Sequence, residues 1–148
     1  MYGDRWGDEY YTLLDVVDRL IDLLTERYTS LYKASKAFGK HYTYFTKNLY
    51  TTCTPPRTKT IIDICKFLNV NMNYVVFGID KGEYTGPSEV SYKNFMTVYN
   101  SVYKGLKCPV LNTLMCQWHK IKYKHIPLKY LIKVAREQKV TIDWLIGG

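Results

Sequence analysis

Histidine and cysteine are the side chains in this sequence best suited to metal binding or proton transfer. The three histidines and four cysteines are His41, His119, His125, Cys53, Cys65, Cys108 and Cys116. No carboxylate lies at helical spacing from any of these histidines, and no Cys-x-x-Cys pair occurs, although catalytic pairs and structural zinc sites depend on such spacing. Glycine-rich phosphate loops, Gly-x-Ser-x-Gly elbows and His-Glu-x-x-His motifs are also absent. We therefore expect no enzyme, reduced thiols, and neither a metal nor a cofactor.

Lysine and arginine are abundant after residue 26 and could neutralise a polyanion. The formal net charge is +8, but residues 1–26 carry −5, with seven acidic side chains against two arginines. The remaining 122 residues carry 19 basic and six acidic side chains, a net +13. This asymmetry predicts a basic body that displaces counterions from a polyanion, with an acidic first helix turned away from it. A basic protein without an acidic partner is the alternative.

The composition is that of a globular chain, with 47% hydrophobic and 23% charged residues among 148. No stretch approaches the roughly 18 apolar residues that cross a bilayer. The acidic start lacks the basic region of a secretion signal. We therefore expect a cytoplasmic protein without a membrane partner.

Helical periodicity predicts five short helices before residue 79, and these elements must position the basic side chains. The first is expected from about Leu13 to Arg27, where apolar residues recur every three or four positions. The others are expected at residues 31–38, after an N-cap at Thr29 and Ser30, and at residues 42–50, 61–68 and 72–77. Glycines follow the second and fifth helices, and Pro55 and Pro56 separate the third from the fourth.

The pattern then begins again after a segment rich in glycine and proline. Residues 30–36 recur as residues 101–107 at an offset of 71, and residues 70–78 recur as residues 140–148 at an offset of 70. Two matches at nearly one period indicate a duplicated unit. The sequence therefore predicts an all-α protein of two tandem five-helix units, with unit one at residues 1–78, a linker at residues 79–91 and unit two at residues 92–148.

The closing segments of the two units carry a family resemblance. The run Ile61–Val70 continued to Phe77-Gly78, and Leu131–Ala135 continued to Asp143–Ile146, resemble the fourth and fifth helices of the lambda-repressor-like (Cro-type, or XRE) helix-turn-helix family. The resemblance covers residues 13–78 and 92–148, as two degenerate copies. It implies five helices per unit, of which the third reads bases in the DNA major groove. The function implied is a sequence-specific double-stranded DNA-binding transcriptional regulator, a repressor of phage or bacterial type.

The resemblance also assigns roles to side chains. In unit one, the positions that face base edges hold Tyr42, Thr43, Thr46 and Lys47. The flanking positions that would meet phosphate hold Lys33, Lys36, Lys40, Arg57 and Lys59. In unit two, the outward positions of the recognition helix hold Asn112, Thr113 and Gln117, and amide side chains suit adenine. The basic loop that follows would place Lys120, Lys122 and Lys124 along a phosphate backbone, although a solvated loop is the alternative.

Two departures from the family keep other interpretations open. Leu31 stands where members often have a phosphate-clamping glutamine, and the recognition helix of unit one is rich in tyrosine. A protein-interaction module, such as an antitoxin or adaptor on a helix-turn-helix scaffold, is therefore the alternative function. The 15 tyrosines would suit a stacking platform for single strands, but helical spacing favours cores and rims. If the units act as a homodimer, the apolar excess of the first helix predicts an interface at Leu14, Val16 and Leu23.

Overall fold

The chain forms two compact units, Met1–Tyr84 and Thr85–Gly148. The computed structural model describes residues 2–51, 56–104, 111 and 125–148, with the backbone alone for residues 2–14. Every regular element in these ranges is a helix, which confirms the predicted all-α class. No helix of the described part is long and apolar enough to cross a membrane.

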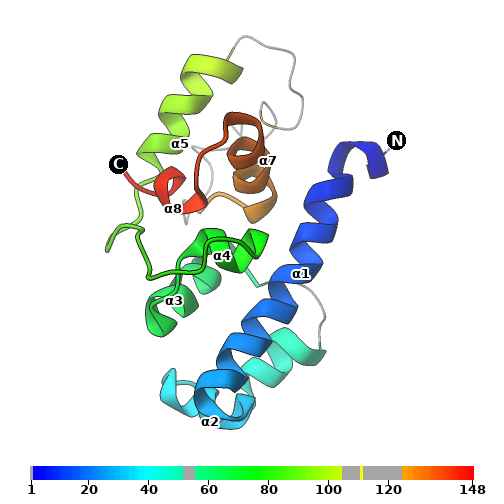
Figure 1. Cartoon of the computed structure of the whole chain (residues 1–148), viewed down its shortest axis with the longest axis vertical. Coiled ribbons are helices and arrows are strands. Elements are labelled where there is room, and N and C mark those ends of the chain that lie inside the picture. The colour runs from blue at the N-terminus through cyan, green and yellow to red at the C-terminus, as the bar shows by residue number, and fades with distance from the viewer. Residues whose placement is uncertain (1, 52–55, 105–110, 112–124) are drawn as a thin grey trace. The chain divides into compact units, whose positions relative to one another are not determined.

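Unit one consists of a long first helix against which shorter helical segments pack (Figure 1). In chain order its elements are α1 (Tyr2–Tyr28), α2 (Leu31–Ala37), the π-helix η1 (Thr46–Thr51), α3 (Thr58–Leu68) and α4 (Met72–Phe77). Helix α1 contacts α2, η1 and α4, and α3 contacts α4. The order of the five segments agrees with the prediction. Three starts differ from it: α1 begins earlier, residues 42 and 43 form a turn so that helical winding begins at residue 44, and α3 begins at Thr58 rather than residue 61. The third segment is also wound as a π-helix from Thr46.

Helix α1 begins at Tyr2, well before the predicted Leu13. The prediction began where the apolar periodicity begins, and periodicity marks the buried face of a helix rather than its full length. Among the described side chains of α1, Val16, Val17, Leu20 and Leu24 are buried. The burial of Val16 removes it from the predicted dimer surface, so this part of the interface prediction is wrong. The side chain of Leu14 lies outside the described part.

The closing helix pair of unit one recurs in unit two. Helix α3 begins at Thr58 and corresponds to α7 (Leu128–Gln138), at the predicted offset of 70. Each of the two ends at a residue in the left-handed region, Asn69 with φ 51° and Lys139 with φ 56°. The following helices, α4 and α8 (Ile142–Leu145), begin at matching positions. The sequence match at this offset therefore reflects the same local structure in both units.

The other sequence match, at an offset of 71, is wrong as a structural correspondence. Ser30 is the N-cap of α2, and its side chain accepts a hydrogen bond from the Lys33 amide. Ser101 instead lies inside the π-helix η2 (Tyr99–Tyr103), which continues α5 (Lys93–Val98). A short match of polar and small residues does not distinguish a cap from a helix interior.

A better correspondence joins Tyr28, the last residue of α1, to Tyr103, the last residue of η2. The Tyr28 ring stacks on Phe67 with centroids 5.3 Å apart, and the Tyr103 hydroxyl donates to Glu137 at 2.6 Å. Phe67 and Glu137 hold equivalent positions in α3 and α7, because the offset that relates these helices also relates these two residues. Tyr28 and Tyr103 therefore end equivalent helices in the two units.

The C-terminal carbonyls of the closing helices are capped differently in the two units. In unit one, Arg19 Nη1 donates to the carbonyls of Val75 and Val76, both at 2.8 Å. In unit two, the amides of Ser91 and Tyr92 donate to Ile146 O, both at 3.1 Å. Because Ile146 corresponds to Val76 at the offset of 70, the same carbonyl position is served by a guanidinium in one unit and by backbone in the other.

Part of the predicted linker is anchored to unit one. The backbone amide of Asn71 donates to Gly82 O at 3.0 Å, and the Asn71 side-chain oxygen accepts from the Gly82 backbone amide at 3.1 Å. The Tyr84 amide donates to Asn69 Oδ1 at 3.3 Å. An asparagine side chain carries both a donor and an acceptor, so it can hold a loop without a strand partner. The predicted ends of unit one at residue 78 and of the linker before residue 92 stay predictions. Residues 82 and 84, within the predicted linker, are hydrogen-bonded to unit one.

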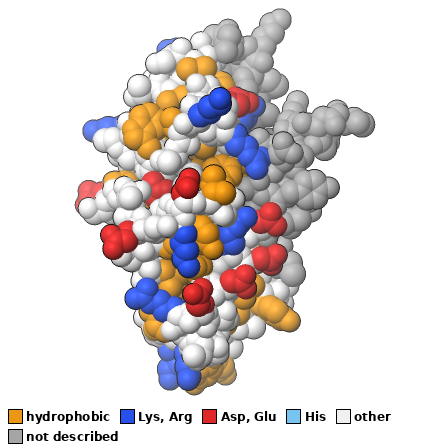
Figure 2. All heavy atoms as spheres, in the orientation of Figure 1, with side chains coloured by type: hydrophobic (Ala, Val, Ile, Leu, Met, Phe, Trp, Pro, Cys, Tyr) orange, Lys and Arg blue, Asp and Glu red, His pale blue; other side chains and the backbone are white. Residues whose placement is uncertain are grey.

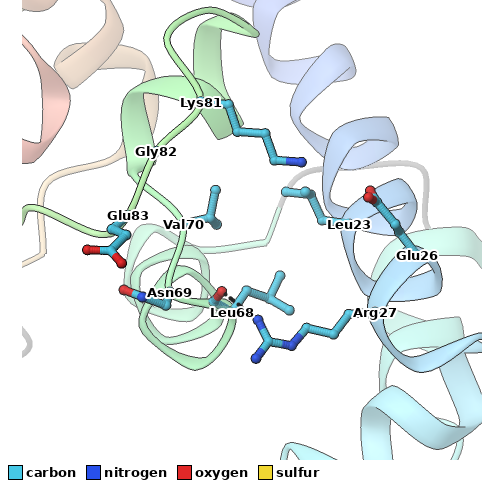
Figure 3. A pocket seen from close by; sticks show the side chains of 9 residues that line it. All are labelled: Leu23, Glu26, Arg27, Leu68, Asn69, Val70, Lys81, Gly82 and Glu83. Carbon is cyan, nitrogen blue, oxygen red and sulfur yellow. Dashed lines mark hydrogen bonds between the residues drawn. The ribbon is translucent and has the colours of Figure 1, made fainter.

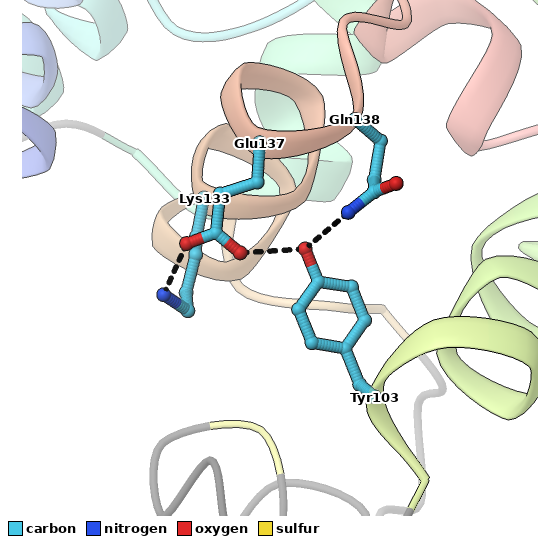
Figure 4. Close-up of polar contacts among 4 residues, drawn as sticks. All are labelled: Tyr103, Lys133, Glu137 and Gln138. Carbon is cyan, nitrogen blue, oxygen red and sulfur yellow. Dashed lines mark hydrogen bonds and ion pairs between the residues drawn. The ribbon is translucent and has the colours of Figure 1, made fainter. Parts of the chain in front are cut away.

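A polar cluster joins the end of η2 to α7 (Figure 4). The hydroxyl of the buried Tyr103 donates to Glu137 and accepts from Gln138 Nε2 at 3.1 Å, while Lys133 Nζ donates to Glu137 at 2.7 Å. Burial alone would raise the pKa of Glu137, but the hydrogen bonds from Lys133 and Tyr103, with the charge of Lys133, outweigh burial and lower it. The ionised form of Glu137 is therefore favoured by folding.

This lowered pKa predicts a pH dependence of the stability of unit two. A carboxyl whose pKa is lower in the folded state stabilises the fold above its ordinary value of 4.5, and this contribution is lost as the pH falls through the folded value. We expect Glu137→Gln to lower the melting temperature near neutral pH, and the difference from the wild type to shrink in acid. Thermal unfolding across a pH series measures this, and a difference independent of pH would contradict it.

Candidate nucleic-acid interface

The segment from α2 to η1 is a compact helical pair held by one buried hydroxyl. Ser35 Oγ donates to Leu31 O at 2.7 Å and accepts from the Phe45 amide at 3.0 Å. The connection between the helices turns at Gly39, whose φ of +82° lies in the region that favours glycine. Phe38 and Phe45 pack with ring centroids 5.2 Å apart. These contacts hold the segment that leads into η1 against α2.

The surface of this pair is strongly basic. Residues 30–60 contain six basic side chains and no acidic one. All six are exposed, and they are the five predicted phosphate contacts of unit one and a predicted base contact: Lys33, Lys36, Lys40, Lys47, Arg57 and Lys59. We call this the basic surface. In Figure 2 the lower end of the molecule, where α2 lies, carries blue side chains, and red ones lie along α1.

One member of the basic surface is already paired. Lys59 Nζ lies 2.8 Å from Asp63 on the next turn of α3. Among the described residues, Lys33, Lys47 and Arg57 form no ion pair. The exposed acids Asp15, Asp18, Asp22 and Glu26 all lie on α1. Unit one is therefore polarised between an acidic first helix and a basic α2–α3 surface.

The predicted base-contacting residues of unit one have unequal surroundings. Thr46 and Lys47 are exposed. Thr43 is half-buried, and its Oγ1 lies 2.8 Å from His41 Nδ1, so its hydroxyl is engaged within the protein. Tyr42 is 48% exposed. The segment is wound as a π-helix from Thr46, a rare geometry that often occurs at functional sites.

Sequence reasoning missed an exposed group of rings next to these residues. The Tyr42 ring lies 4.3 Å from the His41 ring and 5.2 Å from the Tyr32 ring, measured between centroids. Tyr32 is 50% exposed, and Lys36 Nζ lies 5.4 Å over its ring. We call Tyr32, His41 and Tyr42 the aromatic platform. The sequence does contain a signal for this group, because lysines stand next to tyrosine and histidine on both sides of Gly39. The prediction overlooked it because it assigned most tyrosines to cores and rims.

Known proteins offer no guide to this surface. Comparisons with models of protein families, with curated proteins and with solved structures found no match to the chain.

The predicted site residues of unit two lie outside the described residues. These are the base contacts Asn112, Thr113 and Gln117 and the phosphate contacts Lys120, Lys122 and Lys124. Leu111, which is described, is helical and buried. It comes eight residues after Tyr103, and the eighth residue after Tyr28 lies in α2.

Unit one also has a pocket of about 490 Å³ between α1, the end of α3 and residues 81–83 (Figure 3). Its floor is apolar, and its rim carries two basic and two acidic side chains, from Arg27, Lys81, Glu26 and Glu83. Arg27 Nη1 donates to Leu68 O at 3.1 Å, which ties α1 to the end of α3. The rim has no net charge, in contrast to the basic surface. The described residues contain no cluster of histidine, cysteine and acidic side chains that could hold a metal ion.

Proposed function

We propose that the chain is a double-stranded DNA-binding transcriptional regulator, of the repressor type, that binds through the basic surface of unit one. The observation that carries the proposal is the run of six basic and no acidic side chains in residues 30–60, all six exposed on the segment from α2 to the start of α3. Phosphate contacts from lysine and arginine supply most of the affinity of such proteins and release counterions from DNA.

The basic surface sets the expected strength and salt dependence of binding. Each phosphate neutralised contributes about −0.9 to the slope of log affinity against log salt concentration. With Lys59 held by Asp63 at 2.8 Å, about five contacts remain, so a slope of about −4 to −5 is expected for unit one alone. Fluorescence anisotropy with a random duplex across a salt series measures this slope, and selection from a random pool tests for sequence preference.

Charge reversal of two unpaired lysines tests the surface directly. We expect the double variant Lys33→Glu, Lys47→Glu to weaken duplex binding and to reduce the magnitude of the salt slope by about 2, one unit for each lost phosphate contact. Lys81→Glu makes the same kind of change on an exposed lysine outside residues 30–60 and should leave the slope unchanged. An equal loss of duplex affinity and of salt slope in the Lys81→Glu variant would indicate a general charge effect. It would contradict the assignment of Lys33 and Lys47 to phosphate contacts.

Unit two is tested by the same measurement. Reversal of Lys122 and Lys124 should reduce the slope further if the second unit also contacts the duplex. Two linked sites on one duplex raise the effective concentration of the second binding event. If the salt slope falls in the Lys33 and Lys47 variant but not in the Lys122 and Lys124 variant, DNA binding belongs to unit one.

A second candidate function is a protein-interaction module on the same scaffold. The observation that favours it is the exposure of Tyr32, Tyr42 and Tyr50 on the basic surface, with Tyr50 at 67%. Tyrosine and arginine are enriched at protein interfaces. Absence of duplex binding by the wild-type protein at low salt would favour this function over the first.

A further inference from the structure

The aromatic platform brings together three rings from α2 and the turn after it, a segment that carries Lys33, Lys36 and Lys40. The rings of Tyr42, His41 and Tyr32 contact one another, so their orientation is held by neighbouring rings. Tyr32 and Tyr42 nevertheless leave about half of their surface open, at 50% and 48%. Rigid aromatic side chains that are half open are suited to stacking against another flat group.

The groups on this surface that could read a duplex are few. Thr43 is engaged by His41 at 2.8 Å, and the Asn48 side-chain amide donates to Tyr44 O at 2.8 Å. The exposed part of the segment therefore offers Thr46 and Lys47 to base edges, without the paired amides or guanidinium that discriminate bases strongly. In a duplex, moreover, the base faces are covered by their neighbours, and extruding a base costs several kcal/mol.

Single strands remove this cost, because their bases can stack on protein rings. One lysine lies on the platform, Lys36 with Nζ 5.4 Å over the Tyr32 ring, and a second, Lys40, precedes His41 in the chain and has Nζ 5.7 Å over the neighbouring Tyr44 ring. A positively charged surface that follows the backbone, combined with rings that receive bases, is the usual basis of single-strand binding.

We propose that the aromatic platform binds unpaired bases, so that unit one holds a single-stranded DNA segment with bases stacked on Tyr42 and Tyr32 and phosphates on the neighbouring lysines. The proposal rests on the proposed function for the basic surface, and it adds unpaired DNA as a second form that this surface takes besides the duplex.

The test compares single-stranded and duplex DNA on the full chain. Anisotropy is measured with labelled oligothymidylate of about 15 nucleotides, within the range that one single-strand-binding domain covers, and with a duplex of equal length. Tyr42→Ala should lower the affinity for oligothymidylate by about 5- to 150-fold, the usual effect of removing one stacking ring. The salt slope should stay unchanged because no cation is lost. The loss for duplex should be much smaller.

Two further variants separate stacking from folding and from charge. Tyr42→Phe keeps the ring and should keep the wild-type affinity, whereas Tyr32→Ala should repeat the selective loss. An oligonucleotide with a 2-aminopurine reporter gives an independent readout, because stacking quenches its fluorescence. The wild type and Tyr42→Phe should quench it, and Tyr42→Ala should not.

The outcomes distinguish this inference from the function on which it rests. The stacking proposal is overturned if Tyr42→Ala lowers the affinity for single-stranded and duplex DNA equally, or lowers neither. The basic surface would then remain the DNA site. Failure of the wild-type protein to bind either form, even at low salt, overturns both. Selective loss for single strands, with quenching restored by Tyr42→Phe, supports the proposal.

Discussion

Replacing Phe45 by alanine is expected to lower the free energy of unfolding of unit one by about 3–5 kcal/mol, the usual cost of removing a buried phenyl ring. Phe45 is fully buried, and its ring contacts those of Phe38 and Tyr44, with centroids 5.2 and 5.3 Å away. The cavity would lie in the contact between α2 and the segment that leads into η1. Urea denaturation, with hydrogen exchange to locate the loss, measures the effect.

Unit two supplies a matched control for this prediction. Phe95 is also fully buried, and it lies in α5. We expect Phe95→Ala to raise hydrogen exchange in residues 85–148 and Phe45→Ala to raise it in residues 2–84. Loss of protection across both units in either variant would mean that the two units unfold as one, against the expectation.

Replacing Arg19 by alanine is expected to lower the free energy of unfolding by about 2–4 kcal/mol, because it removes charge-assisted hydrogen bonds at the end of α4. Arg19 Nη1 lies 2.8 Å from both Val75 O and Val76 O, and its side chain is 22% exposed. The positive charge also interacts favourably with the C-terminus of the helix. Thermal and denaturant unfolding measure the loss. A change of less than about 0.5 kcal/mol, which is usual for surface substitutions, would contradict the prediction.

Two glycines allow the Arg19 contact to be tested without removing the arginine. Gly78 has φ +77°, and a Cβ there would lie 2.8 Å from Arg19 Nε. Gly39 has φ +82°, with no atom within 4 Å of such a Cβ. Both alanine variants suffer the strain of a left-handed residue, about 1–2 kcal/mol. Gly78→Ala should be the less stable of the two, and the difference should vanish when Arg19 is also replaced.

The closing helices could be predicted from the sequence because local patterns determine them. In α3 and α7 the apolar positions recur at helical spacing, and Ile61, Cys65 and Leu131 are among those that are buried. The C-cap of α7 is less obvious, because Lys139 adopts φ 56° and lysine is not a typical residue for that region.

The features that sequence reasoning missed depend on side-chain contacts and on local winding, which residue spacing does not indicate. The bonds from Arg19 to α4 span 56 and 57 positions, and nothing near Arg19 in the sequence indicates them. The π winding of η1 and η2 does not show in the spacing of their apolar residues. In the candidate site, the type and charge of the basic side chains were predictable, but the engagement of Thr43 by His41 and the exposure of Tyr32 follow from the turn at Gly39.

The capping of α8 by residues near the start of its own unit has a consequence for the order in which the chain folds during synthesis. Asn94 Nδ2 donates to Trp144 O at 2.8 Å, and the Asn94 amide donates to Gly147 O at 2.9 Å. Unit two therefore cannot complete these bonds until Trp144 and Gly147 have left the ribosome. The capping of α4 by Arg19 uses residues of unit one alone, so unit one can reach its final structure while the second unit is still being made.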